Sequence, residues 1–168
     1  MDFKRIEIIE GFYAHEYTNI LPARENAQGD FGYVGKEDDQ ISIACYHLYG
    51  YLGKLLDDNI QEETQIGPDQ WYGRYDEYGW NYYTPAQMRN ILSGLREFIK
   101  IVSDDPFDSR FVQYLSPASA LRIPEEGENA YALQRAAELV DFYSRFVSRI
   151  ERMLENMEGY DLIGFVGP

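Results

Sequence analysis

The chain has one cysteine, Cys45, two histidines and no long apolar run. One cysteine cannot form an internal disulfide, which fits a reducing compartment. No stretch approaches the ~18 consecutive apolar residues that a membrane-spanning helix requires. The N-terminus places charges where a signal peptide has its apolar segment. We therefore expect a cytoplasmic protein that does not associate with membranes.

Motifs for catalysis, cofactors and metals are missing as well. The sequence has no serine nucleophile elbow, no zinc-protease helix motif, no phosphate loop and no dinucleotide glycine pattern. Cys45 lies two residues from His47, and on a helix that spacing points the two side chains apart. The acidic residues around 57–63 lack the alternating ligands and central glycine of a calcium loop. We expect no catalytic residue, metal or cofactor, although an enzyme that uses a carboxylate pair needs no local motif.

Positive charge is scarce, and the 168 residues carry a net charge of −14. Residues 38–83 hold nine acidic side chains against two basic ones, so half of the net charge lies in this middle segment. Such a charge repels nucleic acid and anionic membranes, which bind proteins through Lys and Arg. It attracts a basic protein and speeds association with it. The alternative is that the acidity only keeps the protein in solution.

Two long helices are predicted by apolar periodicity. The first covers 84–102, because Thr84, Pro85 and Gln87 form a capping box with proline at its preferred position. The second covers 129–157, where apolar residues recur at steps of three and four. A second apolar row widens its buried face beyond that of a coiled-coil seam. We expect a central helix in a monomer, with a coiled-coil homodimer as the alternative.

The remaining chain gives weaker signals. Helical spacing over 38–59 predicts a third helix, and Gly50 and Gly53 within it indicate either a close backbone approach or a break near residue 50. Residues 3–17 resemble a strand or hairpin around Gly11, with a short helix as the alternative, while 22–37 and 104–127 look like loops. The apolar C-terminal tail is expected to dock on the helices.

These elements predict one mainly α domain spanning residues 1–168. Its architecture would be a helical bundle of three to four principal helices with a possible small N-terminal β element.

Aromatic residues gather between Trp71 and Tyr83, in a segment that contains both tryptophans. One interpretation is a long loop pinned to the core by its rings. Another is an exposed surface for a partner, because Tyr and Trp supply large contact area at low entropic cost. A third is carbohydrate binding by stacking on a sugar. The candidate partner-binding residues are Asp57, Asp58, Glu62, Glu63, Asp69, Trp71, Tyr72, Tyr75, Asp76, Glu77, Tyr78, Trp80, Tyr82 and Tyr83.

The charge and the aromatic segment together favour a binding protein that recognises a basic protein partner. Such a partner could be a toxin or nuclease whose positively charged cleft is covered, as immunity proteins and nuclease inhibitors do. A DNA-mimic inhibitor of a DNA-binding or restriction system shares this charge logic and is the first alternative. The second is a small-molecule or carbohydrate-binding protein or enzyme that uses the aromatic segment.

Overall fold

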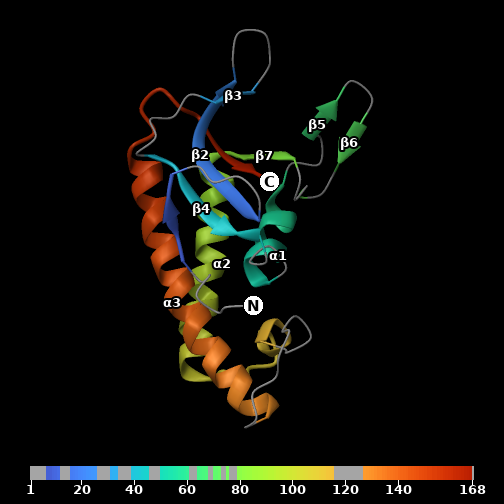
Figure 1. The fold of residues 1–168 in the computed structure, drawn as a ribbon, viewed down its shortest axis with the longest axis vertical. Helices are drawn as coiled ribbons and strands as arrows, with labels where there is room; N and C mark the ends of the chain where they lie inside the picture. Colours follow the sequence, from blue (N-terminus) through green and yellow to red (C-terminus); the bar gives the residue numbers. More distant parts are fainter. Residues whose placement is uncertain are drawn as a thin grey trace.

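The protein combines an antiparallel sheet with three helices (Figure 1). The computed structural model describes residues 7–11, 16–25, 31–33, 39–45, 50–60, 64–67, 70–72, 75, 79–115 and 127–167. Within them the fold is α/β, so the predicted mainly α helical bundle is wrong. The long strand β2 pairs with β4 and with β8 from the other end of the chain, and pairing between such distant segments leaves no local periodic signal.

The main sheet has the strand order β1-β4-β2-β8-β7, and β3 pairs with β2 beyond the end of β4. All of these pairings are antiparallel. The strands are β1 (Ile9–Glu10), β2 (Tyr17–Glu25), β3 (Phe31–Tyr33), β4 (Ile41–Ala44), β7 (Trp80–Tyr83) and β8 (Leu162–Val166). A separate hairpin of β5 (Thr64–Gly67) and β6 (Gln70–Tyr72) projects from the body in Figure 1.

The helices are α1 (Tyr51–Asn59), α2 (Pro85–Asp104) and α3 (Glu128–Glu155), with a short 3-10 helix, η4 (Val112–Leu115), between the last two. The two long predicted helices are confirmed, including the capping box at Thr84 and Gln87. Figure 1 shows α2 and α3 side by side and extending beyond the sheet. An ion pair between Arg96 and Glu151 links them. The apolar stripe of α3 is therefore used within the chain.

The predicted helix over 38–59 is half wrong, because it begins only at Tyr51 and a strand precedes it. That strand, β4, is buried at all four positions, so its residues are apolar or small on both faces. A short run of this kind cannot be told from a buried helix by periodicity. Gly50 is the residue before α1, so the break expected near residue 50 is present.

The predictions for the two ends of the chain are right in part: a strand, β1, lies in the N-terminal segment, and residues 163 and 165 of the apolar tail pack in the core shared with the helices. The N-terminal segment is not a hairpin around Gly11, because β1 pairs with β4 and not with β2. Strand β2 continues into the predicted loop, and the register leaves Pro22 between the part that pairs with β4 and the part that pairs with β3. A missing N–H is tolerated at such a position. The apolar tail is strand β8, in the middle of the sheet between β2 and β7.

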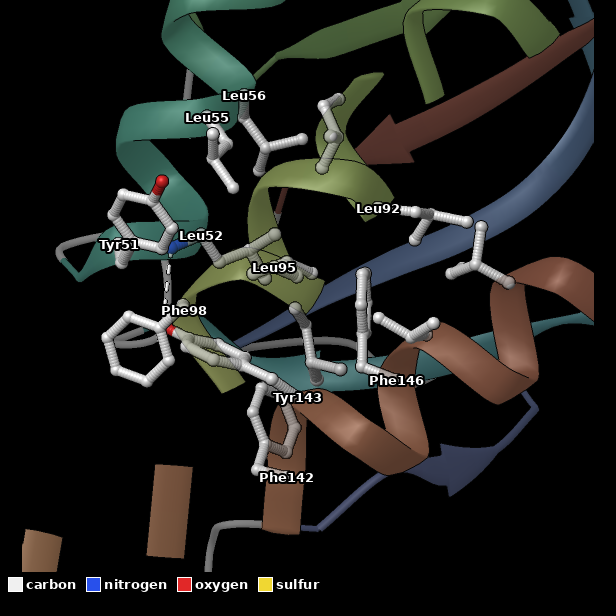
Figure 2. Close-up of a cluster of buried hydrophobic side chains, with 14 of the residues drawn as sticks. Tyr51, Leu52, Leu55, Leu56, Leu92, Leu95, Phe98, Phe142, Tyr143 and Phe146 are labelled. Atoms are coloured by element: carbon white, nitrogen blue, oxygen red, sulfur yellow. Dashed lines mark hydrogen bonds between the residues drawn. The ribbon is translucent and has the colours of Figure 1, made fainter. Parts of the chain in front are cut away.

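One face of the sheet packs against the helices and forms the main core. Strand residues 20, 41, 43, 83, 163 and 165 alternate onto this face and are buried. Figure 2 shows the helical side of the core, in which α1 packs against α2 and α3. The Phe98 ring lies at its centre, with ring centroids 5.3 Å from Tyr51, 5.1 Å from Phe111 and 5.1 Å from Tyr143.

Helix α1 obtains hydrogen-bond partners at both ends from other elements. Gly50 offers no side-chain cap, and the Tyr143 hydroxyl of α3 instead accepts the Leu52 N–H at 3.3 Å (Figure 2). At the other end the Tyr83 hydroxyl of β7 donates to the Leu56 carbonyl at 2.8 Å. Helix termini leave such backbone groups without partners. The two tyrosines therefore replace the caps that the sequence of α1 does not supply.

Tyr143→Phe tests the cap from α3. The substitution leaves a buried backbone N–H without its acceptor, so we expect a loss of about 1–2 kcal/mol in the free energy of unfolding. Chemical denaturation measures it. Tyr160→Phe is the control, since this half-buried tyrosine lies outside the core cluster and should change stability by less than about 0.5 kcal/mol. Equal stability of Tyr143→Phe and the wild type would contradict the capping role.

The approach of α1 to α2 depends on a glycine. A Cβ atom added at Gly94 would lie 2.6 Å from Cδ2 and 2.9 Å from Cδ1 of Leu55, closer than van der Waals contact. Leu55 is buried in the core, so its side chain has little room to move.

Gly94→Ala should therefore destabilise the protein, because overpacking costs about 1–3 kcal/mol and exceeds the gain of ~1 kcal/mol in helix propensity. In a Leu55→Ala background the clash is gone, and the same change should be stabilising. A double-mutant cycle measured by denaturation gives the coupling. Additive effects of the two substitutions would show that Leu55 does not limit the helix approach.

Candidate partner-binding surface

The fourteen candidate residues divide according to what the structure describes. Six of them lie outside the described residues: Glu62, Glu63, Asp69, Asp76, Glu77 and Tyr78. Trp71 and Tyr72 are placed by their backbone in β6, where they pair with Gln65 and Thr64. The remaining six have described side chains, which lie on α1, on β7 and, in one case, between these two elements. They are Asp57, Asp58, Tyr75, Trp80, Tyr82 and Tyr83.

Tyr83 belongs to the core. Its side chain has no exposed surface, and its ring meets Phe165 edge to face with centroids 5.3 Å apart. Burial raises the pKa of its hydroxyl, and the nearby Tyr75 and Asp57 raise it further. This tyrosine is a structural anchor with no surface to offer a partner.

Tyr75 is partly buried and attaches the aromatic segment to the body of the protein. Its backbone N–H donates to Oδ1 of Asp57 on α1 at 2.9 Å. Its ring also approaches Phe165 edge to face, with centroids 6.4 Å apart. The residue therefore touches both α1 and the strand at the centre of the sheet.

Trp80 and Tyr82 lie two positions apart on β7 and so on the same face, opposite to Tyr83. Their rings are stacked, with centroids 6.2 Å apart and planes at 24°. Tyr82 is half-buried against a second apolar cluster made by Leu21, Ala23 and Val166, and burial raises its pKa to about 12. Trp80 remains 43% exposed. The stacked pair thus has one ring fixed to the protein and one ring facing outward.

The carboxylates Asp57 and Asp58 are exposed in the last turn of α1. A negative charge there is unfavourable next to the negative end of the helix dipole. Asp58 forms an ion pair with Lys54 one turn earlier, and that hydrogen bond raises the pKa of the Lys54 ammonium. Asp57 is engaged by the Tyr75 backbone. The structure therefore brings Asp57, Tyr75 and Tyr83 together and places Trp80 on the other face of the sheet.

The described residues contain neither a cluster of metal-ligating side chains nor a membrane-spanning helix. Nowhere among them do three His, Cys, Asp or Glu side chains gather closely enough to hold a metal ion. In the same part of the chain, no helix is both long and apolar enough to cross a membrane. Comparison with protein-family models, curated proteins and solved structures finds no match.

Buried tyrosines predict a loss of stability at alkaline pH. A raised pKa favours the neutral hydroxyl in the folded state. The stability that this contributes is complete below the ordinary tyrosine pKa of about 10 and is lost as the pH rises through the raised pKa. Burial raises the pKa values of Tyr82 and Tyr143 to about 12. We expect the free energy of unfolding to fall between about pH 10 and pH 12, measured by denaturant titration and tyrosinate absorbance. Tyr143→Phe should show a shallower fall, and an unchanged stability across this range would contradict the expectation.

Proposed function

We propose that this protein binds a basic protein partner in the cytosol and that Trp80 lies at the centre of the contact surface. The observation that carries the proposal is a tryptophan that is 43% exposed on a strand of the sheet in a chain of net charge −14. Tryptophan is among the residues that contribute most to binding energy at protein interfaces.

The way in which Trp80 is held by its neighbours supports a binding role. Strand pairing with β8 places Trp80 opposite Val166 and fixes the backbone, while the half-buried Tyr82 ring supports the indole from one side. An anchor that is held in place before binding loses little conformational entropy when the partner arrives. The exposed indole is therefore suited to fill a pocket on another protein.

The charge supports a basic partner. The net charge of −14 creates a field that attracts positive charge over distances of about a Debye length. A toxin or nuclease with a cationic active-site cleft fits this description, because carboxylates can occupy the places of substrate phosphates. The proposed action is neutralisation of such a partner, with association that is fast and sensitive to salt.

Trp80→Ala tests the proposal, with Phe107→Ala as a matched control. Phe107 is 44% exposed and follows α2, a helix of 20 residues that begins directly after β7, so it lies about 30 Å away along the helix. The wild type and Phe107→Ala should capture the same basic protein, such as one encoded beside this gene. Trp80→Ala should bind it at least about 30-fold more weakly.

Thermal unfolding of the three proteins provides the check on folding. Trp80→Ala should unfold near the temperature of the wild type, since Trp80 belongs to neither apolar core cluster. Capture that is equally strong with Trp80→Ala, or no basic protein bound by the wild type at low salt, would overturn the proposal. A captured protein that competitor duplex DNA displaces would be a DNA-binding protein, as the DNA-mimic alternative requires.

A further inference from the structure

The segment from Tyr75 to Tyr83 begins and ends at neighbouring residues of α1. At its start the Tyr75 N–H donates to the Asp57 carboxylate at 2.9 Å. At its end the Tyr83 hydroxyl donates to the carbonyl of Leu56 at 2.8 Å. Tyr75 and Tyr83, which flank Trp80 in the chain, are therefore both hydrogen-bonded to the last turn of α1.

The same two tyrosines also contact one aromatic ring of the sheet. Phe165 in β8 is met edge to face by Tyr75 at 6.4 Å and by Tyr83 at 5.3 Å between centroids. Phe165 itself is fully buried and belongs to a central strand. Each end of the segment thus has one polar contact with α1 and one aromatic contact with the sheet.

The contacts of Tyr75 and Tyr83 differ in strength and in exposure to solvent. Tyr83 is inside the core and continuous with a paired strand, so its position is fixed by burial. Tyr75 is only partly buried, and its polar contact is made by an exposed side chain. A hydrogen bond from an N–H to a carboxylate is among the stronger ones. The hydrogen bond between Asp57 and Tyr75 is therefore the contact that a single surface substitution can remove.

We infer that Asp57 is a positioning residue: its carboxylate oxygen holds the backbone at Tyr75, whose ring packs on Phe165 of β8, the strand that pairs with Trp80. This role differs from a direct charge contact with the partner, which the sequence alone suggested for Asp57. The inference rests on the proposed function for its effect on binding, whereas the holding of Tyr75 can be measured without any partner. An acid at the unfavourable end of α1 is explained by the backbone N–H that it accepts.

Two substitutions separate positioning from charge. Asp57→Asn removes the charge and keeps a carbonyl oxygen that can accept the Tyr75 N–H, whereas Asp57→Ala removes both. Asp58→Asn is the matched control, because it removes one charge from the adjacent exposed carboxylate, which pairs with Lys54.

Hydrogen exchange on the full chain tests the positioning itself. In Asp57→Ala we expect the Tyr75 amide to exchange about tenfold faster than in the wild type, as the loss of a hydrogen bond to a charged group implies. Asp57→Asn and Asp58→Asn should stay within about threefold of the wild type. Equal exchange in Asp57→Ala and the wild type would overturn the inference.

Binding to the basic protein captured by the wild type tests the consequence. Asp57→Ala should weaken it about tenfold, while Asp57→Asn should match Asp58→Asn within about threefold. The same loss in Asp57→Asn and Asp57→Ala would show a charge contact and overturn the inference. If the wild type captures no basic protein, the proposed function fails, and the exchange rates still decide whether Asp57 holds Tyr75.

Discussion

The structure depends on a short helix that cannot complete its own hydrogen bonds. Helix α1 has nine residues and no side-chain cap at Gly50, so it is below the length at which an isolated helix is stable. The Leu52 N–H of its first turn donates to Tyr143 from the helical layer, and the Leu56 carbonyl of its last turn accepts from Tyr83 of the sheet. Because these hydroxyls come from different layers, α1 is formed only where both layers meet. It joins the sheet to the pair of long helices.

The sequence predicts what is determined locally and misses what depends on distant partners. The capping box of Thr84 and Gln87 and the apolar stripes of α2 and α3 are contained within each helix, and both helices were predicted within a few residues. Strands β4 and β8 are four and five residues long and largely buried, so neither shows an alternation of buried and exposed positions long enough to be recognised. Their identity follows from pairing with β2, whose residues lie elsewhere in the chain. No local pattern encodes that pairing.

The candidate surface shows the same division. Aromatic density marks the region from Trp71 to Tyr83 but does not tell which rings are outside. On β7 neighbouring residues point to opposite faces, so Tyr83 is inside and Trp80 is partly exposed although they are three positions apart. The contact between Asp57 and Tyr75 joins residues 18 positions apart and has no counterpart in sequence spacing. Charge and aromatic content are the basis for proposing a basic partner, and the tertiary contacts decide which side chains such a partner could reach.

The central place of β8 has a consequence for the order of folding. Residues 19–23 of β2 pair with residues 162–166, so the middle of the sheet is closed by a contact between distant parts of the chain. Contacts of such large sequence separation form slowly, because a long loop must first be closed. In the described sheet β7 is joined to β2 only through β8. A growing chain that has not yet delivered residues 162–166 therefore lacks the strand on which Trp80 is ordered.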